Sequence, residues 1–328
     1  YSNGAWAGLT LLPWIPKYDE FGNHNVNIPS NSYQNPRATA DYDDQWSKSY
    51  KFNGTMFLRW EPIKHLVIET RNSAEAAFTQ DRRYWNPLSR GSASEPTLQT
   101  IKSQYTNLTT SNTINYSNVF GGYHSLRVLA GQEATAYKYE YSYVYAPGVD
   151  ANIPYQNTAP QDKVESEVGF SNDTMLSFFG IADYNYDNRY FVQATVREDG
   201  SSLFGAKNKW GLFWSASASW NISNERWMEN TKNWLSLLKI RASYGLNGNN
   251  GIGPYQAYGV YASSQYNNVV GMLPSRPAND YLSWEKNSTW NVGLDFGFFQ
   301  NRIRGNFDVY ERTTLDMLLD VKVPQTTG

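Results

Sequence analysis

The stretch that decides the fold reads Gly-Leu-Phe-Trp-Ser-Ala-Ser-Ala-Ser-Trp-Asn, from Gly211 to Asn221. Successive side chains of a β-strand point to opposite faces, so this segment has two different sides. One side is apolar, and the other is small and polar except for Phe213. A soluble sheet would bury the apolar side under a second sheet. A transmembrane barrel would turn it to lipid and turn the polar side to a wet lumen. The apolar side carries Leu212, Trp214, Ala216, Ala218 and Trp220.

The amino-acid composition argues against several classes of protein. The 328 residues carry a formal net charge of -2, which argues against nucleic acid as a partner because such binding needs a basic face. Aromatic residues make up 16%, and Tyr and Trp are typical of membrane-interface girdles, although carbohydrate-binding soluble sheets are rich in them too. No stretch reaches the roughly 18 to 20 apolar residues of a membrane helix, a length that barrel strands do not need. The absence of cysteine excludes a disulfide framework.

Strand-like segments come in pairs joined by short connections, which predicts hairpins. The first of these turns is expected at Glu61-Pro62. Between the pairs lie long polar stretches at 75–110, 140–172 and 247–283, which we expect to be loops. Alternation of short and long connections is typical of outer-membrane barrels, with tight periplasmic turns and long extracellular loops. A longer connection on the short side, 222–237, is expected to hold a helical turn. The predicted pairs are 50–60 with 63–70, 112–120 with 125–139, 174–186 with 189–198, and 287–296 with 303–312.

Charged residues follow the same alternation. They share the polar side of segments 239–246, 289–296 and 302–312. A charge that faces lipid at mid-depth costs roughly 2 to 4 kcal/mol, so the polar sides are predicted to face the lumen. The charged residues are Lys239, Arg241, Asp295, Arg304 and Asp308.

Four ordered motifs resemble one family. The segment Arg197–Gly205 reads R-E-D-G-S-S-L-F-G and precedes Trp210-Gly211. The segment Leu238–Asn249 reads L-K-I-R-A-S-Y-G-L-N-G-N, and Trp284-Glu285-Lys286 precedes N-V-G-L-D-F from Asn291. The order and spacing resemble the barrel of SusC-like TonB-dependent outer-membrane transporters. The resemblance is sharp over 174–328, weaker before that, and departs slightly at Leu246.

The resemblance implies a barrel of 22 strands with a lumen plugged by an N-terminal domain. The hairpin pattern supplies about ten strands. We therefore expect an all-β, antiparallel transmembrane β-barrel in part, with 1–328 inside the barrel domain and with the plug domain and C-terminal strands outside this sequence. The implied function is uptake of oligosaccharides or peptides across the Gram-negative outer membrane. The implied partners are a SusD-like surface lipoprotein, the TonB complex through the plug, and outer-membrane lipid, with no cofactor and no enzymatic activity.

Several motifs suggest chemistry, and each has a structural alternative. Asp199-Gly200-Ser201-Ser202 is interpreted as a tight loop rather than a catalytic or cation-binding loop. The glycine-rich Gly245–Gly253 precedes Pro254-Tyr255 instead of a helix, which favours a strand end over a phosphate loop. The carboxylates of Asp41–Asp44 lack EF-hand spacing and are interpreted as a solvated loop. The sequence has no G-x-S-x-G elbow, and its histidines lack zinc-ligand spacing. The histidines are His24, His65 and His124.

Tyrosines of the polar stretches leave two interpretations open. They form a glycan platform, because sugar faces stack on aromatic rings, or a strand extension above the girdle. Two other protein classes also remain open: a soluble, aromatic-rich β-sandwich that binds or hydrolyses carbohydrate, and a passive porin. The sequence assigns no catalytic, cofactor-binding or metal-binding residue and leaves the ligand-binding residues unknown. The tyrosines are Tyr137, Tyr139, Tyr141, Tyr143, Tyr145, Tyr255, Tyr258, Tyr261 and Tyr266.

Overall fold

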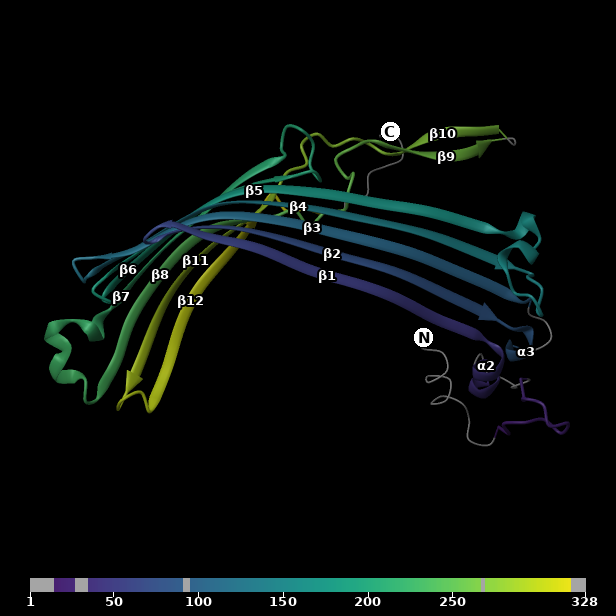
Figure 1. Ribbon diagram of the computed structural model, residues 1–328, viewed down its shortest axis with the longest axis horizontal. Helices are drawn as coiled ribbons and strands as arrows, with labels where there is room; N and C mark the ends of the chain where they lie inside the picture. The colour runs from purple at the N-terminus through teal and green to yellow at the C-terminus, as the bar shows by residue number, and fades with distance from the viewer. Residues whose placement is uncertain (1–14, 27–34, 91–94, 267–268, 320–328) are drawn as a thin grey trace. The chain divides into compact units, whose positions relative to one another are not determined.

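The computed structural model describes residues 15–26, 35–90, 95–266 and 269–319 (Figure 1). Among these residues, no helix has the length and apolar composition needed to cross a bilayer. The helical elements are α2 (Pro36–Tyr42), α3 (Pro87–Arg90), η1 (Gln156–Thr158), η2 (Gln161–Lys163), η3 (Ile222–Asn224) and η4 (Arg226–Thr231). The strands are β1 (Asp44–Ile63), β2 (Leu66–Trp85), β3 (Thr97–Phe120), β4 (His124–Pro147), β5 (Glu165–Tyr186), β6 (Tyr190–Ser201), β7 (Trp210–Asn221), β8 (Leu235–Asn249), β9 (Val260–Tyr266), β10 (Val269–Arg276), β11 (Glu285–Phe298) and β12 (Ile303–Leu315).

Ten strands form one sheet in the order β1-β2-β3-β4-β5-β6-β7-β8-β11-β12. The pairs from β5 to β12 in this order are antiparallel, and almost every strand lies beside its neighbour in sequence. The exception is the hairpin of β9 and β10, which forms a separate two-stranded sheet between β8 and β11 in the chain. The prediction of an all-β, antiparallel fold with about ten strands is confirmed.

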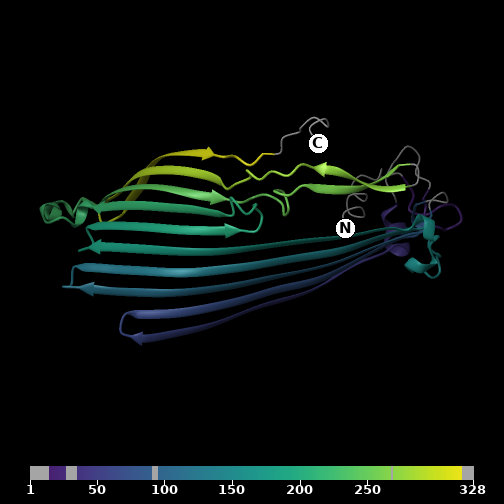
Figure 2. The same ribbon diagram turned by 90° about the horizontal axis from the view of Figure 1, so that it is seen from above.

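The short connections lie together at one end of the strands (Figure 2). Positive φ angles at Asp187 and Asn188 make the tight β5–β6 turn, as a two-residue hairpin requires. The predicted first turn at Glu61-Pro62 is wrong by a few residues, because β1 continues to Ile63. Proline cannot take a positive φ. The chain therefore turns at Lys64-His65, where His65 has a φ of 75°. The predicted helical turn in 222–237 is confirmed as η3 and η4.

The expectation of long loops at 75–110 and 140–172 is wrong for most of their length. Strand β2 continues to Trp85 and β3 begins at Thr97, while β4 continues to Pro147 and β5 begins at Glu165. The period-two pattern of apolar residues is not visible there, because polar residues occur on both faces of these strand ends. The backbone ladder does not depend on that alternation, and Thr and Tyr favour strands. The third stretch, 247–283, holds the end of β8 and the β9–β10 hairpin.

The chain divides into two compact units. The first, here called the cap unit, comprises Tyr1–Asn53, Glu75–Thr106 and Lys138–Ser171. The second, the wall unit, comprises Gly54–Ala74, Asn107–Tyr137 and Asn172–Gly328. The cap unit has a buried cluster of Tyr84, Leu98, Ala146, Val149 and Ala159. The wall unit has two clusters, Phe204 with Phe213 and Trp284, and Ile222 with Met228 and Leu235.

Candidate functional site

One face of the wall unit is apolar and open. Strand register places Val192 opposite Ala218, and Trp214 opposite both Val196 and Leu246. The side chains of Val192 and Trp214 are 51% and 45% exposed. Soluble monomers rarely expose a continuous apolar surface across several strands. This face therefore has the character of a lipid-contacting surface, as predicted from Gly211–Asn221.

The opposite face carries paired charges. The Nε and Nη2 atoms of Arg241 donate to the two carboxylate oxygens of Asp295 at 2.9 and 3.0 Å. Nη2 also donates to Asp308 at 3.1 Å. Lys239 lies opposite Asp295 in the register of β8 and β11. Arg304 lies opposite Gly297, and Gly297 is on the same face of β11 as Asp295, two residues away. The five predicted charged residues therefore share one face, as expected.

A hollow of about 570 Å³ opens on this polar face. Arg127 contacts Asp183 at 3.4 Å, and Gln193 donates to Asp183 at 2.6 Å. Because the carboxylates are paired with cations and amides, the surface offers many hydrogen bonds without a strong excess of one charge. Such a surface can contact a polar cargo or a polar protein segment. Its serines are Ser117, Ser125, Ser217, Ser219 and Ser243.

The Asp199–Ser202 motif is mostly strand, so its interpretation as a tight loop is wrong. Strand β6 continues through Ser201, and Asp199 is buried opposite Ser177 of β5. Arg197 donates from Nε to Asp199 at 2.6 Å and from Nη2 to Ser177 at 2.9 Å. This network extends the ladder beyond the predicted strand end. Only Ser202 leaves it, and its hydroxyl accepts the backbone N–H of Thr174 at 2.8 Å.

Phe213, the apolar exception on the polar face, belongs to a buried aromatic cluster. Its ring lies 5.4 Å from that of Trp284, which lies 5.1 Å from that of Phe204. The Trp284 indole donates to the carbonyl of Lys209 at 3.1 Å. Two family motifs, widely separated in the sequence, therefore meet here and hold the connections after β6 and before β11. We call Phe204, Phe213 and Trp284 the aromatic anchor.

The glycine-rich Gly245–Gly253 lies partly in β8, which ends at Asn249. The prediction of a strand that runs into a loop is confirmed. At Gly248 the Phe213 ring covers the backbone so closely that a Cβ atom would lie 2.5 Å from the ring atom Cε1. Glycine is needed here because an aromatic ring occupies the space of a side chain.

The tyrosines from Tyr137 to Tyr145 lie in β4, which confirms the strand extension. The rings of Tyr139 and Tyr141 are 6.0 Å apart, and the Tyr141 hydroxyl donates to Glu167 at 2.5 Å. This hydrogen bond raises the pKa of Tyr141. Burial, and then the charge of Glu165, raises the pKa of Tyr143. These phenols therefore stay neutral at physiological pH and can donate hydrogen bonds, while the glycan platform itself stays a prediction.

The remaining tyrosines lie in the wall unit. Tyr255 and Tyr258 lie in the connection before β9. Tyr261 lies in β9, where its side chain is 65% exposed. Tyr266 ends β9, and its side chain lies outside the described residues. The nine candidate tyrosines therefore come from β4, from β9 and from the connection before β9.

The Asp41–Asp44 cluster is not the solvated loop expected from the sequence. It spans the end of α2 and the start of β1. Asp41 accepts from His24 and Arg37, both at 2.9 Å, and Asp43 accepts from the hydroxyl of Ser89 at 2.6 Å. These partners order the carboxylates. Among the described residues, no three His, Cys, Asp or Glu side chains gather as a metal site would require.

Sequence reasoning missed the role of Glu225, which joins η3 to η4. Its side chain is 8% exposed and accepts from Arg189 at 3.1 Å. It also accepts from the Tyr190 hydroxyl at 2.6 Å and from the Trp220 indole at 3.0 Å. These hydrogen bonds lower the pKa of Glu225, the Tyr190 bond most strongly. One carboxylate thus holds the start of β6 and the end of β7 together. The spacing of its three partners in the sequence does not show that they meet.

The family described as "TonB dependent receptor-like, beta-barrel" matches residues 1–328. The chain belongs to this family. It is 29% identical to TonB-dependent receptor P26 of Formosa agariphila over 99% of this chain and 34% of that protein. It is 30% identical to TonB-dependent receptor SusC of Bacteroides thetaiotaomicron over 100% of this chain and 33% of that protein. The chain thus spans about a third of the length of these relatives.

Solved structures support the same fold. The structure of the RagAB peptide transporter matches with a TM-score of 0.82 and 27% identity, over 95% of this chain and 35% of that chain. The suspected SusC-like resemblance is confirmed, and so is the prediction that the barrel lies in the outer membrane. The alternative of a soluble β-sandwich is wrong, because the apolar face belongs to a barrel wall that meets lipid.

Proposed function

We propose that the chain forms a section of the barrel wall of a TonB-dependent importer that takes up oligosaccharides or peptides. A SusD-like lipoprotein would cover its extracellular mouth, and a plug domain would connect it to the TonB complex. The two-faced wall unit carries the proposal, since it combines an open apolar surface with a polar surface of paired charges and serines. Transport across such a wall needs no covalent chemistry, so we propose no enzymatic activity.

The tyrosines of β4 are the strongest candidates for contact with cargo. Side chains alternate along an unbroken strand, so Tyr139 and Tyr143 share one side of β4. In this proposal, that side of β4 faces the lumen. Aromatic faces stack on sugar rings and on peptide side chains, and phenols hydrogen-bond to hydroxyl or amide groups.

Both cargo classes remain in the proposal for physical reasons. Aromatic rings, neutral phenols and carboxylates suit a polar, uncharged oligomer with hydroxyl or amide groups along its length. One solved relative is named a peptide transporter, and another relative is named SusC without a printed cargo. Only direct binding measurements can separate oligosaccharides from peptides.

Cells that carry the full-length protein test the proposal. Uptake of labelled oligosaccharide and peptide pools is measured with and without functional TonB, and the co-purified lipoprotein is identified by mass spectrometry. Loss of uptake without TonB supports the importer. Equal uptake without TonB would overturn it in favour of a passive porin.

A variant tests the tyrosine contact directly. Tyr143→Ala should weaken cargo binding by the purified complex, whereas Tyr143→Phe should keep most of it because the ring remains. Tyr155→Ala is the matched control, since Tyr155 lies in the same unit with its side chain 64% exposed and outside β4. Equal affinity of the Tyr143→Ala and Tyr155→Ala proteins would exclude the β4 tyrosines from the cargo site.

A further inference from the structure

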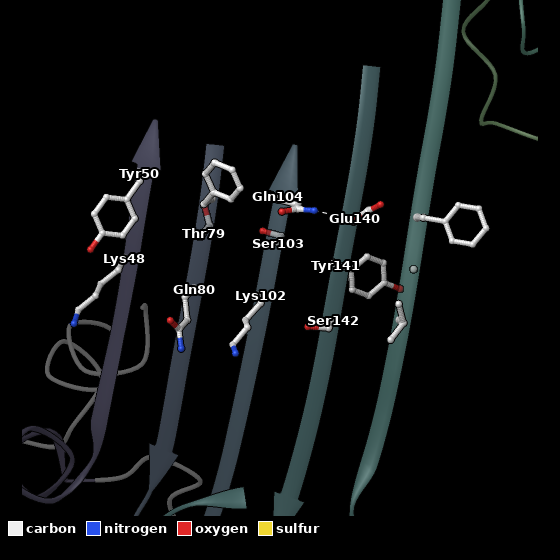
Figure 3. Close-up of a pocket in the computed structure, with 14 residues that line it drawn as sticks. Lys48, Tyr50, Thr79, Gln80, Lys102, Ser103, Gln104, Glu140, Tyr141 and Ser142 are labelled. Atoms are coloured by element: carbon white, nitrogen blue, oxygen red, sulfur yellow. Dashed lines mark hydrogen bonds between the residues drawn. The ribbon is translucent and has the colours of Figure 1, made fainter. Parts of the chain in front are cut away.

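A hollow of about 650 Å³ lies on one face of β1 to β5 in the cap unit (Figure 3). The ammonium-bearing side chains of Lys48 and Lys102 line it together with the rings of Tyr50, Phe78 and Phe170. Figure 3 shows Lys48, Gln80 and Lys102 on successive strands. No described residue lines both this hollow and the hollow of the wall unit.

The hollow carries uncompensated positive charge. Lys48 and Lys102 are exposed, and neither has a carboxylate partner among the described residues. The Lys48 ammonium lies 4.6 Å from the centre of the Trp46 ring, which restricts its position. The carboxylate that lines the hollow, Glu140, is already occupied, because Lys138 contacts it at 2.6 Å and Gln104 donates to it at 2.6 Å. An incoming anion would therefore meet two available ammonium groups.

Large apolar side chains surround the lysines and are exposed. Tyr50 is 71% exposed, Phe78 52% and Phe170 66%. Exposure of such rings to bulk water is unfavourable. Aromatic rings are typical of membrane interfaces, where one part of the side chain contacts lipid and another contacts water. The combination of cations with exposed rings matches an anionic amphiphile better than a simple ion.

Strand geometry gives the side of the sheet. Strand β1 is unbroken from Asp44 to Ile63, and its side chains alternate. Within the cap unit, Lys48 and Tyr50 therefore share a side of β1 with Phe52, which is 62% exposed, while Ser47, Ser49 and Lys51 share the other side. Exposed apolar side chains on a barrel strand face lipid. The hollow is thus on the lipid side of the strand, where transported cargo does not pass.

We propose that this hollow binds the phosphorylated headgroup of a glycolipid in the outer leaflet. Ammonium groups form charge-assisted hydrogen bonds with phosphate oxygens, and each cation near a membrane adds about 1 kcal/mol of attraction to anionic lipid. The rings of Tyr50, Phe78 and Phe170 then contact the apolar faces of the sugars. The proposal rests on the outer-membrane location and on the hollow, and it is independent of the cargo.

Lipid binding by the purified full-length protein tests this proposal. The delipidated protein is mixed with lipopolysaccharide in nanodiscs, with the same lipid after enzymatic removal of its phosphates, and with inorganic phosphate alone. The variant K48Q/K102Q should bind the phosphorylated lipid roughly thirtyfold more weakly at low salt. The control K163Q/K207Q removes the same charge from lysines paired with Glu95 and Asp280, and it should bind like the wild type.

The lipid-binding experiment has several outcomes that distinguish a glycolipid site from other sites. Wild-type affinity in K48Q/K102Q would overturn the proposal, and so would equal binding of the dephosphorylated lipid. Displacement of the lipid by millimolar inorganic phosphate would indicate a simple anion site. Saturable binding of the purified lid lipoprotein that K48Q/K102Q abolishes, without an effect on lipid, would assign the hollow to a protein partner. If the double variant fails to insert, K48Q and K102Q are measured singly, each with an expected loss of about fivefold.

Discussion

The aromatic anchor gives the sharpest test of how the sequence holds its long connections. In Gly248→Ala the new methyl carbon would lie 2.5 and 2.6 Å from two atoms of the Phe213 ring, against about 3.5 to 4.0 Å for carbons in contact. The ring cannot retreat freely, because Phe213 is 5% exposed and packs on Trp284. Overpacking of this kind costs about 1 to 3 kcal/mol.

A double-mutant cycle isolates the cause. Phe213→Ala should cost about 3 kcal/mol, since it opens a cavity beside Trp284. In that background Gly248→Ala places its methyl group in the cavity and restricts the unfolded chain, so it should be neutral or stabilise by about 0.5 kcal/mol. The predicted coupling between the two positions is about 2 kcal/mol.

Native-state hydrogen exchange on the full-length protein in detergent measures the effect. The amides of Asn208 and Leu282 donate to carbonyls within the connections that the anchor holds, at 3.2 and 3.3 Å. Their opening free energies should fall in Gly248→Ala, whereas adding Gly248→Ala to Phe213→Ala should not lower them below the values for Phe213→Ala alone. Gly180→Ala is the control, because a methyl group there meets Val196 at an ordinary 3.5 Å. An equal cost of Gly248→Ala with and without Phe213 would refute the reasoning.

Three further predictions concern the wall unit. Ala218→Lys should cost about 2 to 4 kcal/mol in vesicle refolding, whereas Ser217→Lys, one residue away on the polar face, should cost much less. Arg241→Ala should lower the temperature at which the barrel loses its compact gel mobility more than Asp308→Asn does, since it removes the cation that Asp295 and Asp308 share, whereas Asp308→Asn leaves the pair of Arg241 with Asp295 in place. Glu225 has a lowered pKa, so its carboxylate stabilises the fold above the unfolded value of about 4.3 and loses this effect as pH falls through the folded value. Glu225→Gln should therefore be less stable than the wild type at neutral pH, and the gap should close in acid; a gap independent of pH would contradict this assignment.

The alternation of apolar and polar residues made it possible to assign the two faces of β7, β8, β11 and β12 to lipid and lumen. A charge that faces lipid is costly, so the sequence favours charged residues on the luminal face. The same signal failed in the cap unit. Around Lys102 and Tyr141 both faces of the strands carry polar residues, so the sequence resembled a loop although the ladder continues. Glu225 could not be predicted, because its three donors converge only once β6 and β7 are paired.

The motifs that identified the family are better explained by packing than by chemistry. Arg197 and Asp199 complete a polar network at the end of β6, while Phe204 and Trp284 bring the two flanking connections onto Phe213. A barrel wall must present variable loops to different cargoes without loosening its own strands. An anchor of buried aromatic residues at the base of those loops separates the two demands, since the loop beyond it can change while the strand ends stay in place. On this argument, swapping the segment between Ile252 and Leu282 with that of a relative should change cargo affinity but leave exchange at Asn208 unchanged. Increased exchange there would show that the anchor does not isolate the wall from its loops.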